Sequence, residues 1–139
     1  MNIDSIKNGV VIDHIAAGKA MQLYNMLGLE ALDCTVAVIK NVSSKKMGKK
    51  DIIKIDTSLD LDFDVVGFIS PSATINIIEN EKLVKKTHVE MPKRLVNIIK
   101  CKNPRCITTT EQDIEHIFVR SDKKKEEYRC FYCETKAQI

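Results

Sequence analysis

The chain has 139 residues, 44% of them hydrophobic, and a formal net charge of +3 at pH 7. This length suits one domain or two small ones, and this apolar content is typical of a globular chain, so disorder is not the default expectation. The sequence has no apolar run near the roughly 20 residues of a membrane span and begins without a charged-then-apolar signal segment. We therefore expect a cytoplasmic protein with no membrane partner.

The first half of the chain predicts three strands and one helix. Residues 9–15 are apolar and β-branched, which is typical of a strand. Residues 18–30 carry apolar side chains at helical spacing, and Gly28 is a plausible helix end. Alternation over residues 34–42 predicts a second strand, and a third covers residues 51–55 after a turn-rich connection.

A second helix and two further strands follow. Residues 60–69 begin with acidic side chains and end with apolar ones, which favours a short helix with an acidic first turn. Residues 72–78 are rich in β-branched side chains, and residues 82–90 form another expected strand after a turn. The order β-α-β-β-α-β with one extra strand predicts a ferredoxin-like α/β sandwich for residues 1–92. Pro92 marks its expected boundary.

The remaining segment, residues 93–139, predicts a small second domain. Residues 116–120 and 128–133 have the composition of strands, and the charged stretch between them is typical of a solvated hairpin tip. Four of the five cysteines lie here as two pairs, Cys-x4-Cys and Cys-x2-Cys, with 23 residues between the pairs. The fifth, Cys34, is expected to be a buried strand residue.

The paired cysteines predict a structural zinc site. Zinc takes four tetrahedral ligands, and two short loops supply two thiolates each. A reduced, metal-free cluster and a redox pair are the alternatives. Four thiolates leave no position for water, so the expected role of the metal is to stabilise a segment near the lower size limit for an apolar core. The expected ligands are Cys101, Cys106, Cys130 and Cys133.

The expected fold class is therefore α+β: a ferredoxin-like sandwich followed by a small β-rich, zinc-ribbon-like domain. In the first domain, Asp13 and His14 end one strand, Lys50 and Lys54 flank another, and Lys86 lies in the last. On one sheet surface, lysines could bind phosphates and an aspartate could accept from a ribose hydroxyl. The alternative is that each lysine is a solvated edge-strand charge.

Common catalytic and phosphate-binding motifs are missing from the sequence. It contains no GxxxxGK(S/T) loop and no GxGxxG, and no HExxH, Ser/His/Asp set or paired-carboxylate arrangement stands out. This favours an effector-binding, non-enzymatic role over an active site.

Four motifs in a fixed order resemble those of one family. They are IKNGVVIDHI, MGKKDIIKI, SPSATINIIEN and the final C-x4-C…C-x2-C set. Over essentially its full length, the chain resembles the regulatory chains of aspartate carbamoyltransferase, non-catalytic subunits that act in pyrimidine biosynthesis. The resemblance implies an allosteric nucleotide-binding domain over residues 1–92. It also implies a zinc-binding domain over residues 93–139, with one zinc ion per chain, that contacts the catalytic chain.

The family also implies effectors and an assembly. CTP typically inhibits, ATP typically activates, and UTP can reinforce CTP. Regulatory homodimers bridge catalytic trimers in a holoenzyme of two catalytic trimers and three regulatory dimers. We expect these partners for this chain, and no nucleic acid.

The family's effector contacts fall on positions of the first domain. Asp13 and Lys54 resemble the positions that meet ribose and base, and His14 and Lys86 resemble those that meet the triphosphate. Ile6 lies near the expected base position. Further pocket positions implied by the resemblance are Ile3, Asp4, Lys50 and Asn76.

Main-chain groups and two metal-domain residues complete the expected contacts. The main chain around Glu81 and Leu83 would read the exocyclic atoms of the base. Asn103 and Glu134, beside the cysteines, resemble contact points for the catalytic chain.

The chain departs from the enteric-type members of the family. Glu81 stands in place of a tyrosine, Asp4 in place of a glutamate, and Arg105 in place of an asparagine. Enteric members also have a longer C-terminal tail and a longer N-terminal extension, which shapes the effector pocket. The sequence therefore leaves open the UTP effect and the sign of each response.

A zinc-ribbon nucleic-acid-binding protein is the main alternative function. Residues 93–139 carry 11 Lys and Arg against 7 Asp and Glu, and Phe131 and Tyr132 lie between two cysteines. Zinc and its four thiolates together would remove part of this positive charge, which weakens the case for nucleic acid. A small nucleotide-handling enzyme is the second alternative.

Overall fold

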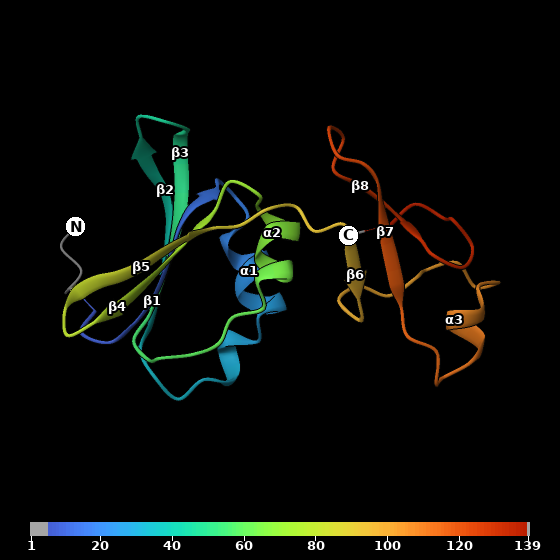
Figure 1. Cartoon of the computed structure of the whole chain (residues 1–139), viewed down its shortest axis with the longest axis horizontal. Coiled ribbons are helices and arrows are strands. Elements are labelled where there is room, and N and C mark those ends of the chain that lie inside the picture. Colours follow the sequence, from blue (N-terminus) through green and yellow to red (C-terminus); the bar gives the residue numbers. More distant parts are fainter. Residues whose placement is uncertain (1–5, 139) are drawn as a thin grey trace. The chain divides into compact units, whose positions relative to one another are not determined.

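The structure is a computed structural model that describes residues 6–138. The chain folds into two compact units, one ending at Glu90 and the other beginning at Met91. Each unit has its own β-sheet (Figure 1). Over residues 6–138, no helix is both long enough and apolar enough to cross a membrane.

A five-stranded antiparallel sheet forms the first unit, in the strand order β2-β3-β1-β4-β5. Both α-helices lie against one face of this sheet (Figure 1). This arrangement confirms the ferredoxin-like sandwich with one added strand that the sequence predicted. In chain order the elements are β1 (Gly9–Ala16), α1 (Ala20–Met26), η1 (Leu29–Ala31), β2 (Val36–Ser44), β3 (Gly48–Ile55), α2 (Phe63–Ile69), β4 (Thr74–Glu79) and β5 (Lys82–His88).

Every second residue of the central strands packs beneath the helices. Ile12 of β1 lies opposite both Ile53 of β3 and Ile75 of β4, and each of the three side chains is at most 1% exposed. Burying an aliphatic side chain of this size stabilises the fold by about 1.5–3 kcal/mol. Because side chains alternate along a strand, Val11 and Asn76 lie on the opposite face, which the helices leave open (Figure 1).

Local signals explain where the helices begin and end. The Asp62 carboxylate accepts hydrogen bonds from the N–H groups of Asp64 and Val65, at 3.0 and 3.4 Å, and so caps the first turn of α2. Such a cap stabilises a helix by about 1 kcal/mol. The helix expected over residues 18–30 is α1 followed by η1, because Gly28 adopts a left-handed φ of 67° between them.

A buried carboxylate ties together the loops at one end of the sheet. Asp51 is fully buried, and its Oδ2 accepts hydrogen bonds from the N–H groups of Gly18, at 3.0 Å, and Ala20, at 3.2 Å. Its Oδ1 accepts from the N–H of Asn41 at 3.0 Å, where the register of β2 shifts. Asp51 therefore fixes the loop after β1 and the bend in β2, on either side of its own strand.

The second unit is a three-stranded antiparallel sheet in the order β6-β7-β8. Leu95, Phe118 and Cys130 lie opposite one another in turn and form a buried row across it. This agrees with the small β-rich domain expected from sequence, although β6 and α3 were not predicted. The elements are β6 (Arg94–Val96), α3 (Ile107–Thr110), β7 (Ile117–Asp122) and β8 (Glu127–Cys130).

Candidate metal centre and polar sheet face

Four cysteine sulfurs from two separate loops converge in the second unit. The Sγ atoms of Cys101, Cys106, Cys130 and Cys133 all lie within 4.8 Å of one another. Two of the separations are 3.6 Å, between Cys101 and Cys133, and 3.7 Å, between Cys106 and Cys130. A tetrahedron with metal–sulfur bonds of about 2.3 Å has edges of about 3.8 Å. The geometry therefore fits one metal ion held by four thiolates.

Threonine hydroxyls support the two knuckles that carry the cysteines. Thr108 Oγ1 lies 3.1 Å from Cys106 Sγ, and Thr135 Oγ1 lies 3.2 Å from Cys133 Sγ. The side-chain N–H of Asn103 donates to Thr135 Oγ1 at 3.3 Å, which links the two knuckles. Such partners orient metal ligands. The sequence analysis missed both threonines, although the spacing Cys-x-Thr at both positions was a usable signal.

The surroundings favour different protonation states for the thiols. Burial raises the pKa of Cys101 to about 12. Burial would also raise the pKa of Cys133, but hydrogen bonds with Thr135 and Asn103 hold the pKa of that thiol at about 6. A cation bound by all four sulfurs would hold every one of them as a thiolate, since coordination removes the thiol proton.

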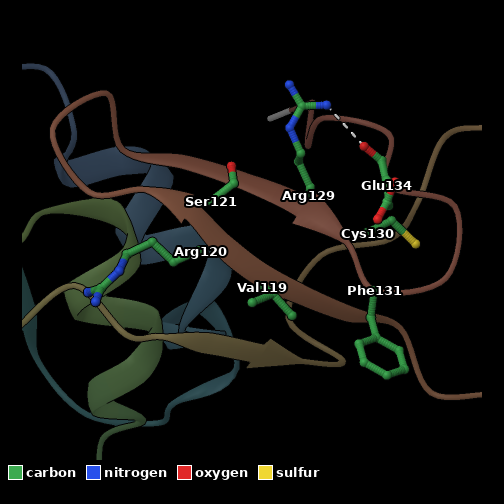
Figure 2. A pocket seen from close by; sticks show the side chains of 7 residues that line it. All are labelled: Val119, Arg120, Ser121, Arg129, Cys130, Phe131 and Glu134. Carbon is green, nitrogen blue, oxygen red and sulfur yellow. Dashed lines mark hydrogen bonds between the residues drawn. The ribbon is translucent and has the colours of Figure 1, made fainter.

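A groove of about 610 Å³ is formed by β7, β8 and the segment that follows β8, beside Cys130 of the cluster (Figure 2). The Arg129 guanidinium donates to the main-chain oxygen of Glu134 at 3.0 Å across one end of it, as Figure 2 shows. Phe131, which also lines the groove, is 53% exposed, and the Arg94 guanidinium lies 5.5 Å from its ring centroid. Exposed rings beside arginines are typical of surfaces that bind other proteins. The groove is lined by Val119, Arg120, Ser121, Arg129, Cys130, Phe131 and Glu134.

Both residues expected to contact a partner lie beside the metal ligands. Glu134 is exposed, has a left-handed φ of 63°, and donates its N–H to the main-chain oxygen of Cys130 at 2.9 Å. Asn103 is half-buried, and its Oδ1 accepts from the N–H of Arg105 at 3.0 Å. The side chain of Asn103 therefore already forms a hydrogen bond within its own loop, whereas Glu134 is exposed to solvent.

In the first unit, the sheet face opposite the helices carries a row of polar residues. Lys54 of β3 lies opposite Val11 of β1, Val11 lies opposite Asn76 of β4, and Asn76 lies opposite Lys86 of β5. The register alone therefore brings Lys54, Asn76 and Lys86, which are far apart in sequence, into one line across the sheet. Asn76 Oδ1 is buried and has no hydrogen-bond partner among residues 6–138.

A second row runs beside the first, displaced by two residues along each strand. Asp13 of β1 lies opposite Thr74 of β4, which lies opposite His88 of β5. The Nζ of Lys50 is 2.9 Å from Asp13 Oδ1, and the Nδ1 of His14 is 3.1 Å from Thr74 Oγ1. These two rows form what we call the polar sheet face, defined by Asp13, His14, Lys50, Lys54, Thr74, Asn76, Lys86 and His88.

The bend of β1 at Asp13 and His14 brings both side chains into this face. His14 has a left-handed φ of 57°, and its N–H donates to Asp13 Oδ1 at 2.6 Å. Burial tends to raise the pKa of Asp13, but its contacts with Lys50 and His14 lower the pKa below the ordinary aspartate value. Asp13 is therefore held as a carboxylate on the polar sheet face, next to Lys50.

An apolar region adjoins the polar sheet face near the β4–β5 turn. Leu83 is 57% exposed and lies opposite Ile78, which in turn lies opposite Gly9. The half-buried Ile6 adjoins Gly9, since a methyl group added to Gly9 would lie 2.9 Å from its side chain. At the turn itself, the N–H of Glu81 donates to the main-chain oxygen of Lys7 at 2.8 Å, so this donor is already in use.

The structure thus brings together most of the residues expected to form the effector site. The expected positions Ile3 and Asp4 lie outside the described residues. The sequence analysis missed Thr74 and His88, which the pairing of β1, β4 and β5 adds to the polar sheet face. The two units together describe an α+β protein that joins a ferredoxin-like domain with a cationic sheet face to a four-cysteine metal-binding module.

Comparison with known proteins identifies the family. The family model described as aspartate carbamoyltransferase regulatory chain, allosteric domain, matches residues 1–90, and the one described as the metal binding domain of the same chain matches residues 93–139. The chain therefore belongs to the family of aspartate carbamoyltransferase regulatory chains, the non-catalytic subunits of that enzyme.

Curated relatives carry the same name. The chain is 52% identical to the regulatory chain of Clostridium botulinum strain Hall over 134 residues, which covers 96% of this chain and 92% of the relative. It is 51% identical to that of Clostridium tetani over 135 residues, with 96% and 94% covered. It is 39% identical to that of Bifidobacterium longum over 139 residues, with both chains fully covered. Membership in this family implies a catalytic chain as partner.

Proposed function

We propose that nucleoside triphosphates bind across the polar sheet face, with CTP and ATP as the effectors of this chain. The observation that carries the proposal is Asn76 Oδ1, a buried acceptor without a partner among the described residues, in the same row as Lys54 and Lys86. Leaving such an atom unpaired costs about 1–3 kcal/mol. A nucleotide that donates a hydrogen bond to this atom, while its triphosphate meets Lys86 and its ribose lies near Lys54, would offset that cost.

The apolar and cationic ends of the polar sheet face set the orientation in which a nucleotide would bind. The base would lie at the apolar end, near Ile6 and Leu83, and the ribose near Asp13 and Lys54. The triphosphate would lie where the cationic side chains gather, beside His14, Lys86 and Lys50. Lysine is a point charge suited to phosphates, and Asp13 as a carboxylate can accept from a ribose hydroxyl. Because the Glu81 N–H already donates a hydrogen bond, the main-chain oxygens near it are the groups that would accept hydrogen bonds from the base.

This division of labour predicts which contacts distinguish the effectors. CTP and ATP carry the same triphosphate, so His14 and Lys86 would give affinity without selectivity. Discrimination would come from the size and edge of the base near Ile6 and Leu83. Each nucleotide must favour one state of the holoenzyme over the other, with a typical coupling free energy of about 1–3 kcal/mol.

The second unit would hold one structural zinc ion on its four cysteines and dock on the catalytic chain. A metal with four thiolate ligands has no open position, so its chemistry is to fix the fold of its loops. Glu134 and the exposed rings of Phe131 and Tyr132 lie beside those loops and would contact the catalytic chain, with the half-buried Asn103 as a further contact. We propose a cytoplasmic holoenzyme of two catalytic trimers bridged by three regulatory homodimers, as the family implies.

Titration calorimetry of the full chain with CTP and with ATP tests the effector site. Lys86→Ala should weaken both nucleotides by a similar factor, because it removes a contact to the shared triphosphate. Lys85→Ala is the matched control: Lys85 lies opposite Ile77, whose side chain alternates with Asn76, so it occupies the other face of the same strand. If Lys86→Ala weakened only one of the two nucleotides, Lys86 would not bind the triphosphate that they share. If the unmodified chain bound neither CTP nor ATP, the proposed site would be refuted.

A further inference from the structure

His88 lies on the polar sheet face, although no sequence motif indicated it. It is the last residue of β5 and is exposed. It lies two residues beyond Lys86, so the two side chains share one face of the strand and are separated by about 7 Å along it. Because His88 lies directly opposite Thr74, their Cβ atoms are about 5 Å apart.

Thr74 also forms a hydrogen bond with the side chain of His14. The Nδ1 of His14 lies 3.1 Å from Thr74 Oγ1. One hydroxyl on β4 is therefore flanked by an imidazole from β1 on one side and an imidazole from β5 on the other. Both rings lie at the end of the face away from the apolar Leu83 and Ile78.

The other charged groups around this pair leave a net positive surface. From β1, the carboxylate of Asp13 faces Thr74, but the Nζ of Lys50 from β3 lies 2.9 Å from it and offsets its charge. From β5, Lys86 adds a cation on the same face as His88. A polyanion lying along the face away from the apolar end would meet Lys86 first and His88 beyond it.

We propose that His88 is a further effector-contact residue, which binds the phosphates farthest from the base together with Lys86. This inference rests on the nucleotide site proposed above and extends it to a residue that would act on triphosphates and not on monophosphates. His88 can donate a hydrogen bond from either ring nitrogen when it is protonated, and one when it is neutral.

The test compares CTP with CMP in titration calorimetry of the full chain at pH 7. His88→Gln should weaken CTP by about threefold, as expected for an exposed charged contact, and leave CMP unchanged. His88→Arg should restore CTP binding, and Lys85→Gln on the opposite face of β5 should behave like the unmodified chain. Equal weakening of CTP and CMP by His88→Gln, or no weakening of CTP, would overturn the inference while leaving the nucleotide site in place. Failure of the unmodified chain to bind CTP would remove both.

Discussion

The Nζ of Lys50 lies 2.9 Å from Oδ1 of Asp13, and both side chains are only partly exposed, at 16% and 22%. This pair links β3 to the bend of β1 and fixes the carboxylate at the edge of the proposed triphosphate position. In the free chain the charge of Lys50 is therefore already paired with that of Asp13. Lys50 can bind a phosphate only if it keeps this ion pair while it does so, or gives it up.

The lowered pKa of Asp13 predicts a specific pH dependence of stability. Burial opposes the shift, while Lys50 and the N–H of His14 produce it. A carboxyl with a lower pKa in the folded state stabilises the fold above its unfolded pKa of about 3.9, and that contribution disappears as the pH falls through the folded pKa. Asp13→Asn should therefore lower the free energy of unfolding by less than about 1 kcal/mol at pH 7. The variant should also lose less stability than the unmodified chain as the pH falls.

Amide hydrogen exchange in β1 between pH 6 and pH 3 measures this effect within the first unit, where loss of metal from the second unit does not interfere. Asp33→Asn serves as the matched control, because Asp33 is exposed. An acid dependence of β1 that is the same in the unmodified chain and in Asp13→Asn would show that the pair does not contribute.

Asp51 should be among the most sensitive positions of the first unit. Its carboxylate is fully buried and accepts three main-chain hydrogen bonds, from Gly18, Ala20 and Asn41. Asp51→Asn keeps the size but replaces one acceptor oxygen with an N–H₂ group facing N–H donors. We expect a loss of about 3 kcal/mol or more in the free energy of unfolding, measured by urea denaturation. Asp56→Asn, at an exposed position, should change it by less than about 0.5 kcal/mol.

Much of the first unit follows from local signals, but the composition of its polar face does not. The alternation of Ile53, Lys54 and Ile55 predicts a strand with one buried and one open side. The acidic start of residues 60–69 predicts a helix, and the structure begins α2 just after Asp62, which caps it. Which lysine lies opposite which asparagine depends on strand register, and register is set by pairing between segments far apart in sequence. His88 joined the face only through its pairing with Thr74.

In the second unit, the cysteine spacing predicted the cluster, because four sulfurs around one ion are a chemical constraint independent of register. Two elements had no local signal. β6 has only three residues and depends on pairing with β7, which buries Leu95 against Phe118. α3 is a single turn of Ile107 and three threonines, residues with low helix propensity, held between a cysteine ligand and Glu111.

Removal of the metal should unfold the second unit before the first. Metal binding supplies much of the stability of so small a domain, since its sheet has three short strands and little apolar area to bury. We expect about one zinc ion per chain by elemental analysis, and none after mercurial treatment or in Cys106→Ser. Hydrogen exchange should then become fast across β6, β7 and β8 while β1 and β4 stay protected.

Cys34→Ser is the matched control for this experiment, because Cys34 is a half-buried cysteine outside the metal-binding cluster. It should leave the metal content unchanged. Protection of the second sheet that survives complete metal loss would show that the four cysteines do not hold this fold together.

Asn76 should show opposite effects on stability and on effector binding. Its buried Oδ1 has no partner among the described residues, so the free chain carries the cost of an unsatisfied acceptor. Asn76→Leu replaces the amide with an apolar group of similar size, and should raise the free energy of unfolding of the nucleotide-free chain by about 1 kcal/mol. The same change removes the atom that a bound nucleotide would satisfy, so the increase in Tm caused by saturating CTP should shrink. Thermal unfolding with and without CTP measures both effects. A variant that is less stable without nucleotide, or that retains the full CTP-dependent increase in Tm, would mean that the amide is satisfied in the free chain and is not a binding group.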